Sequence, residues 1–223
     1  MTYDGIVVDY GHGGMIDGKY QTAGKQYCFT DHEDYWIGEG ITNRKTAALL
    51  IKLALRSGIR VWDCVKKCEW TRAPEWTELE QTDTSLGSRV AYANEGERRK
   101  AIFLSLHSNA IGNSSTGPSL SARGVVMFTS EGQTGADPIA ESITEAFKRH
   151  VAPDVPVRRG DRADGDQDAE AQFYVLRKTV APAVLGEVGF FTNINDARFL
   201  DSEQGQRRIA RAYLDGIRPF IQD

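Results

Sequence analysis

Short apolar runs rich in valine and isoleucine alternate with longer segments of helical periodicity along most of this chain. The runs are roughly four to eight residues long and are bounded by glycine, proline or polar residues, which is typical of strands. This alternation favours an α/β fold with a twisted, mainly parallel sheet of about six strands, flanked by helices on both faces. The expected strands span residues 5–9, 59–65, 101–107, 124–129 and 183–188, with a short one at 173–176.

The clearest helical signal lies in residues 39–57, where apolar side chains recur at helical spacing and Gly58 follows as a favourable C-cap residue. Further helices are predicted at 84–100, 137–150 and 203–221, with a short turn at 196–200. The segments that fit neither a strand nor a helix are expected to be loops, and they are residues 11–38, 112–122 and 151–171. No internal repeat or linker divides the chain, so we expect one domain over residues 1–223.

Charge and cysteine content restrict the classes of partner and compartment. The formal net charge of -4 gives no overall basic field for binding nucleic acid. No run of about 18 apolar residues is present, so we expect no membrane insertion. The three cysteines suit reduced thiols, and packing explains Cys64 and Cys68 better than metal binding does. The N-terminal sequence has no features of a secretory signal, so we expect synthesis in the cytoplasm without a signal peptide.

Two histidines lie where expected strands end. His12, in the sequence YGHGG, follows the first strand, and His107 ends the third. Because neighbouring parallel strands place their carboxyl ends at one edge of a sheet, we expect the two imidazoles to meet there. Zinc binds histidine nitrogen and accepts a carboxylate as third ligand, with a fourth position left for water. A lone histidine in a turn is more often a satisfied surface group, so a metal site requires an acidic residue nearby.

Glu39 is the first candidate for that acidic residue. It stands at the start of the first predicted helix, from where its carboxylate can point across the sheet edge. Its position also has a simpler explanation, since carboxylates favour helix N-termini. A rival cluster in the preceding loop consists of Asp31, His32, Glu33 and Asp34. A solvated acidic loop explains that cluster equally well.

Glu187 interrupts an otherwise apolar segment in the sequence LGEVGFFTN. A carboxylate at such a position is costly to bury unless it is paired or hydrogen-bonded. Burial would raise its pKa, and a base with a pKa nearer neutrality is what a hydrolase needs to take a proton from water. A structural ion pair is the alternative explanation for Glu187.

Four motifs, taken in order, resemble the zinc-dependent N-acetylmuramoyl-L-alanine amidases of the amidase_3 type. They are YGHGG, the helix start Glu39-x-x-x-Asn43, the S-x-H-x-N of residues 105–109 and the PAVLGEVGFFTN of residues 182–193. Any one motif is weak evidence, whereas four in the family's order are specific. The resemblance covers nearly the whole chain. Tyr10 departs from it, because family members usually carry a small residue or proline there.

The resemblance implies one zinc ion held by His12, Glu39 and His107, with Glu187 as the catalytic carboxylate. Zinc in such a site lowers the pKa of bound water toward about 7 and polarises the scissile carbonyl. Glu187 would take the water proton and pass it to the leaving amine. Glu33 is the alternative third ligand, because the loop between His12 and Glu39 is long.

The function implied by the resemblance is hydrolysis of the peptidoglycan amide between N-acetylmuramic acid and L-alanine. A compact domain without a separate cell-wall-binding domain is similar to a phage lysin, which would act on the cell wall as a monomer after release. The alternatives are a delivered effector or tail-associated lysin, a zinc amidohydrolase of a different amide, and a catalytically inactive wall-binding domain. The short stretch between residues 129 and 137 also predicts an enzyme without a built-in inhibitory helix.

Overall fold

A seven-stranded sheet forms the centre of the molecule, with strand order β12-β11-β13-β8-β1-β6-β7. The computed structural model describes residues 1–113, 117–160, 165 and 167–222. Neighbouring strands from β13 to β6 are parallel, whereas β11 runs antiparallel to β13 and β7 antiparallel to β6. The strands are β1 Gly5–Tyr10, β6 Arg60–Asp63, β7 Cys68–Trp70, β8 Ile102–Asn109, β11 Val125–Thr129, β12 Ala169–Glu170 and β13 Ala183–Phe190.

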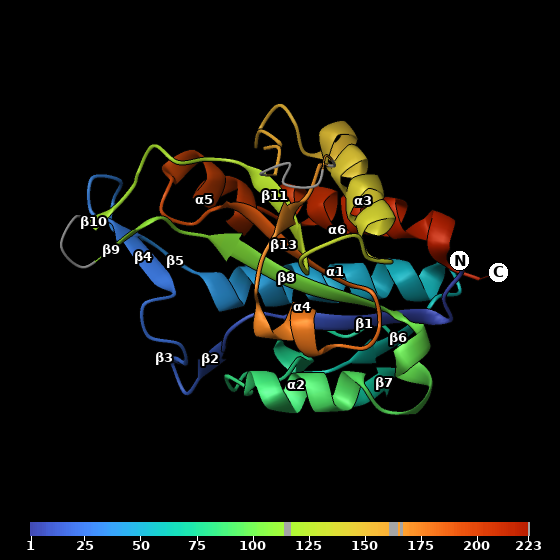
Figure 1. The fold of residues 1–223 in the computed structure, drawn as a ribbon. Coiled ribbons are helices and arrows are strands. Elements are labelled where there is room, and N and C mark those ends of the chain that lie inside the picture. The colour runs from blue at the N-terminus through green and yellow to red at the C-terminus, as the bar shows by residue number, and fades with distance from the viewer. Residues whose placement is uncertain (114–116, 161–164, 166, 223) are drawn as a thin grey trace.

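Helices cover both faces of this sheet (Figure 1). On one face α6 packs against both α1 and α3, and on the other α2 contacts α4. The helices are α1 Glu39–Arg56, α2 Leu86–Ala93, α3 Asp137–His150, α4 Tyr174–Lys178, α5 Ile194–Asp201 and α6 Glu203–Ile217. Short 3-10 turns complete the helical content at Trp76–Glu78, Gly96–Lys100 and Arg218–Phe220. The two chain ends lie side by side, where Tyr3 bridges to Ile221.

The core forms because the central strands are apolar on both sides. Every residue of β1 is buried, as expected of a strand with helices above and below it. Helices α3 and α6 approach each other closely at Gly216 of α6. A Cβ at this position would lie only 2.5 Å from the Cα of Ile143 in α3. Tyr213, three residues earlier, meets the ring of Phe147 edge to face, with 5.0 Å between ring centroids.

The α/β class and the mainly parallel sheet are confirmed. The helix expected at 39–57 is α1, and Gly58 follows it with a φ of 75°, the left-handed conformation that glycine allows at a helix end. The helix expected at 84–100 is shorter, because α2 ends at Ala93 and a 3-10 turn replaces the rest. Gly96, also in the left-handed region, lies at the break. The short turn expected at 196–200 is the helix α5.

The prediction of a strand at 173–176 is wrong, because Phe173 is the N-cap of α4 and the other three residues form its first turn. The sheet edge beside β11 is occupied by β12, a different segment of the chain. The 173–176 segment instead crosses a face of the sheet and buries Val175 and Leu176 there. The sheet also has more strands than expected, since β7 and β12 are too short for their sequences to predict them.

The loop expected at 11–38 contains two small hairpins, which are β2 Met15–Ile16 with β3 Lys19–Tyr20 and β4 Gln26–Phe29 with β5 Tyr35–Gly38. The loops expected at 112–122 and 151–171 lie partly outside the described residues. Their described parts include the β9 Gly112–Asn113 and β10 Gly117–Pro118 pair and the edge strand β12. Within the described part of the chain, no helix has the length and apolarity needed to cross a lipid bilayer.

Candidate metal centre

His107 is placed by the regular geometry of the sheet. It lies near the carboxyl end of β8, and the residue opposite it in β13 is Glu187. On the other side of β8, the backbone N–H of Gly11 donates to the carbonyl of Leu106 over 3.0 Å. A Cβ at Gly11 would lie 2.1 Å from Cε1 of His107. Position 11 therefore has to be glycine, because the imidazole occupies the space where a side chain would be.

His12 is placed beyond the end of β1, outside the regular sheet. Its backbone is left-handed, with a φ of 66°, which is uncommon for a residue other than glycine. Its ring meets that of His107 edge to face, with centroids 5.0 Å apart and an interplanar angle of 89°. Both imidazoles are largely buried, with exposed side-chain fractions of 17% for His12 and 16% for His107.

Glu39 lies between the two histidines, at the N-terminus of α1 and completely buried. Its Oε1 is 3.0 Å from Nδ1 of His107 and accepts the backbone N–H of Ser108 over 3.1 Å. Its Oε2 is 3.3 Å from Nε2 of His12 and 3.5 Å from Nζ of Lys25. The free N–H groups and the dipole of α1 stabilise a negative charge at this position.

The donor atoms of these three residues form a compact set. One ligand atom from each of His12, Glu39 and His107 lies within 4.8 Å of the others. Nε2 of His12 and Oε2 of Glu39 are buried and face each other over 3.3 Å, and neither makes a hydrogen bond to any other group in the described structure. Buried polar atoms are rarely left unpaired, and two imidazole nitrogens with a carboxylate are a donor set typical of zinc. The cluster is therefore consistent with binding one metal ion.

The carboxyls of Glu39 and Glu187 differ in their electrostatic environments. Burial would raise the pKa of Glu39, but hydrogen bonds with His107 and His12 outweigh burial and hold that pKa well below its usual range. Burial raises the pKa of Glu187 to about 7, and this rise persists although His107 favours the charged form. Oε2 of Glu187 is buried without a hydrogen-bond partner in the described structure. Glu39 is thus suited to hold a cation, and Glu187 to exchange a proton near neutral pH.

The structure brings together the predicted residues His12, Glu39 and His107, with Glu187 on the neighbouring strand. It places the alternative ligand Glu33 on an exposed turn between β4 and β5, away from the histidine pair. Cys64 is buried, and its Sγ lies 3.6 Å from Oδ1 of Asp9, so it packs in the core as the sequence suggested.

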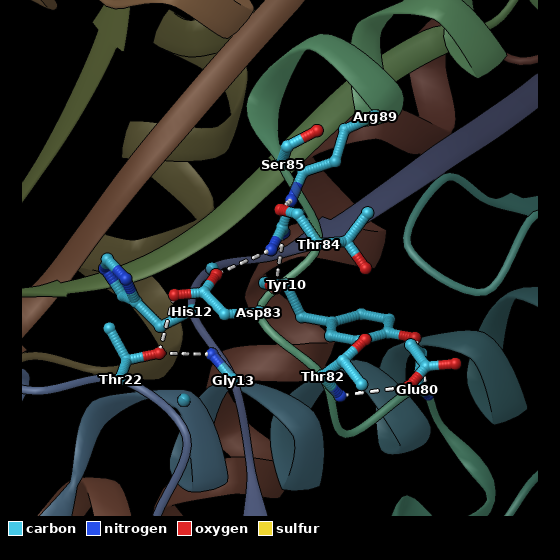
Figure 2. A network of polar contacts seen from close by, with 12 residues as sticks. Tyr10, His12, Gly13, Thr22, Glu80, Thr82, Asp83, Thr84, Ser85 and Arg89 are labelled. Atoms are coloured by element: carbon cyan, nitrogen blue, oxygen red, sulfur yellow. Dashed lines mark hydrogen bonds and ion pairs between the residues drawn. The ribbon is translucent and has the colours of Figure 1, made fainter.

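Sequence reasoning missed Lys25, whose ammonium reaches Glu39. A single lysine in a polar loop carries no signal of such a contact. It also missed the polar network beside His12 that Figure 2 shows, because its residues come from separate segments. Arg89 carried no signal of this network either, because a charged residue next to an apolar one is ordinary in an amphipathic helix.

Comparison with known proteins identifies the family of this chain. The model of the Amidase_3 family, described as N-acetylmuramoyl-L-alanine amidase, matches residues 6–219. The chain belongs to the Amidase_3 family. The resemblance seen in the sequence motifs is thereby confirmed, and the cluster of two histidines and one glutamate lies inside the matched range.

Relatives of this Amidase_3 chain include an uncharacterized cell wall amidase of Bacillus anthracis, 26% identical over 222 residues, which are 97% of this chain and 35% of the relative. The probable cell wall amidase LytH of Staphylococcus epidermidis is 23% identical over 216 residues, which are 97% of this chain and 58% of LytH. The Amidase_3 chain thus spans about a third of the first relative's length and somewhat over half of the second's.

Solved structures show the same fold. The N-acetylmuramoyl-L-alanine amidase AmiC2 of Nostoc punctiforme superposes with a TM-score of 0.68 at 20% identity, over 96% of this chain and 95% of that one. The catalytic domain of the CD27L endolysin, which targets Clostridia difficile, gives a TM-score of 0.62 at 16% identity, over 99% of this chain and all of that one (100%). At such low sequence identities, the structural similarity shows only that this Amidase_3 chain shares the fold of these proteins.

Proposed function

We propose that this chain is a zinc-dependent N-acetylmuramoyl-L-alanine amidase. It would hydrolyse the peptidoglycan amide between N-acetylmuramic acid and the L-alanine of the stem peptide. The observation that carries the proposal is the buried cluster of His12, Glu39 and His107, with Glu187 opposite His107 in the next strand. Membership of the Amidase_3 family supports the choice of amide and of polymer.

In this proposal His12, Glu39 and His107 hold one zinc ion. When bound, zinc supplies a Lewis acid that polarises a carbonyl and makes water more acidic. Glu187 acts as the general base, because its pKa of about 7 lets it accept a proton at neutral pH and give it up again. It takes one proton from the attacking water and delivers it to the leaving nitrogen. The new C–O bond forms first and the C–N bond then breaks, which gives a free L-alanine amine and a lactyl carboxylic acid that releases its remaining proton to the solvent.

The proposal is tested by digesting purified peptidoglycan sacculi and detecting stem peptides with a free L-alanine amine by mass spectrometry. Chelation is expected to abolish their release, and added zinc to restore it. Glu187→Gln should keep zinc but lose about 100- to 10,000-fold in turnover, the usual contribution of a general base. Glu33→Gln is the matched control, an acidic residue on an exposed turn, and should change neither zinc content nor turnover.

Two results would overturn the proposed function. One is release of stem peptides at the wild-type rate by Glu187→Gln or by the metal-free protein. The other is intact sacculi after incubation with the zinc-loaded wild type, together with hydrolysis of a different amide substrate. The second result would instead favour a zinc amidohydrolase of another class.

For the biological role, we propose a monomeric lysin that is made in the cytoplasm and reaches the wall on release. Three free cysteines fit synthesis in a reducing compartment, and the fold shared with the CD27L catalytic domain fits a lytic enzyme. Expression with and without a pore-forming membrane protein tests this role. Lysis only when pores are present supports release, whereas lysis without pores contradicts it.

A further inference from the structure

The two histidines of the metal centre differ in how their backbones are held. His107 lies in a hydrogen-bonded strand, whereas His12 has a left-handed backbone with a φ of 66°. For residues other than glycine that conformation costs about 1–2 kcal/mol. Something outside the sheet must therefore stabilise the turn at His12, and Figure 2 shows polar side chains gathered beside it.

We infer that Thr22 and Asp83 are positioning residues for His12, holding its backbone in the conformation that turns the imidazole toward Glu39. The Thr22 hydroxyl accepts the backbone N–H of Gly13 over 2.7 Å and donates to Oδ2 of Asp83 over 2.7 Å (Figure 2). The hydroxyl is thus used as acceptor and as donor. It fixes the peptide group immediately after His12. This inference rests on the proposed role of His12 as a metal ligand.

Asp83 is itself held from the far side by Arg89 of α2. Nη2 of Arg89 is 3.4 Å from Oδ1 of Asp83, and Nη1 donates to Oδ1 of Asp9 over 2.6 Å and to the carbonyl of Tyr10 over 2.8 Å. The arginine is almost completely buried. The chain of contacts runs from α2 through Asp83 and Thr22 to the backbone after His12, so Thr22 and Asp83 act on the metal site through that backbone.

A second set of contacts keeps the rest of this loop folded without Thr22. The backbone N–H of Gly14 donates to the carbonyl of Gln81 over 2.8 Å, and that of Met15 to the Gln81 side chain over 3.2 Å. Arg44 of α1, fully buried, donates from Nε to the carbonyl of Glu80 over 2.8 Å. Removal of the Thr22 hydroxyl is therefore expected to release the His12–Gly13 peptide specifically, with the surrounding loop retained.

Thr22→Val tests the inference, because valine has the shape of threonine without its hydroxyl. We expect the zinc dissociation constant, measured by competition with a fluorescent chelator, to rise about tenfold, as for other residues that orient metal ligands. Thr22→Ser restores the hydroxyl and should restore the affinity. Asp83→Ala, which removes the acceptor of that hydroxyl, should weaken zinc binding in the same direction. Thr71→Val, at an exposed threonine, is the matched control and should leave the affinity unchanged.

Amide hydrogen exchange in the metal-free protein gives a second readout. The Gly13 N–H should exchange about fivefold faster in Thr22→Val than in the wild type, the change expected for loss of one hydrogen bond. Unchanged zinc affinity in Thr22→Val would overturn the inference, and so would equal losses in Thr22→Ser and Thr22→Val. If the wild type binds no zinc, the proposed function fails, and Gly13 exchange still decides whether Thr22 holds this backbone.

Discussion

The two sides of the metal centre are built by different means. On one side, β8 fixes His107 through hydrogen bonds to β1 and β13, and the alternation of side chains along a strand sets the direction of its imidazole. On the other side, His12 follows the end of β1, and polar side chains from distant segments hold its loop. The same kind of ligand is thus obtained once from regular secondary structure and once from a tertiary network.

Because of this difference, the positions of His107 and His12 depend on different parts of the structure. The strand that carries His107 belongs to the buried core, so its position is linked to the stability of the whole fold. The loop of His12 depends on a few polar contacts and on buried Arg89, which joins Asp9 to Asp83. Substitutions on the two sides should therefore divide their effects differently between metal affinity and stability.

The largest effect is expected at Glu39, the residue that contacts both histidines. Glu39→Gln removes the negative charge, and we expect zinc affinity to fall by about 100-fold or more, beyond what loss of an orienting residue causes. Zinc content after dialysis, measured by atomic emission, checks this. If Glu39→Gln retains one zinc per chain while Glu33→Gln loses it, the ligand set on which the comparison depends is wrong.

A large effect on stability is expected from Arg89→Met, which breaks the polar network on the side of His12. It leaves the carboxylate of Asp9 buried without its counter-charge, which typically costs about 3–5 kcal/mol in free energy of unfolding. Urea unfolding of the metal-free protein at pH 7 measures this loss. A loss below about 1 kcal/mol, the range of exposed ion pairs, would contradict the importance of this network.

The effect of Arg89→Met should also depend on pH. Burial opposes ionisation of Asp9, but Arg89 and smaller contributions from His107 and Ser105 lower its pKa below the ordinary 3.8. The ion pair therefore contributes fully above the unfolded-state pKa, and its contribution is lost as the pH falls through the lower pKa of the folded state. The stability gap between wild type and Arg89→Met should narrow below about pH 4. A gap that stays constant from pH 7 to pH 3 would contradict this assignment.

The smallest effect is expected from a substitution near His107, and it tests whether the two sides of the metal centre differ. Ser105, two residues earlier in β8, donates its hydroxyl to Oδ2 of Asp9 over 2.6 Å. Ser105→Ala should cost about 1.5 kcal/mol in free energy of unfolding, as for a hydrogen bond to a charged group. Zinc affinity should stay unchanged, because the strand holds His107 without that hydroxyl. If Ser105→Ala lost as much zinc affinity as Thr22→Val, His107 and His12 would depend equally on side-chain hydrogen bonds, and the proposed difference between the two sides would be wrong.

Much of the fold and two of the site residues follow from local patterns in the sequence. The apolar runs that became β1, β8 and β13 predicted strands because their periodicity depends only on neighbouring residues. Once these strands are parallel, the residues at their carboxyl ends must meet at one edge. The pattern of strands along the chain therefore predicts that His12 and His107 lie together, whereas the place of Glu187 beside them followed from the family resemblance.

Tertiary structure decided the features that local patterns left open. The acidic residues 33 and 39 both follow His12 along a polar loop, and only the path of the β4–β5 hairpin brings Glu39 between the histidines while Glu33 stays exposed. The pairing of Thr22 with Asp83 joins residues 61 positions apart. Periodicity describes neighbours along the chain, whereas these contacts depend on where packed elements place distant segments. The sequence by itself therefore determined the α/β class, the central strands and the histidines at their ends, and tertiary packing determined the short outer strands, which acid lies between the histidines and what holds His12.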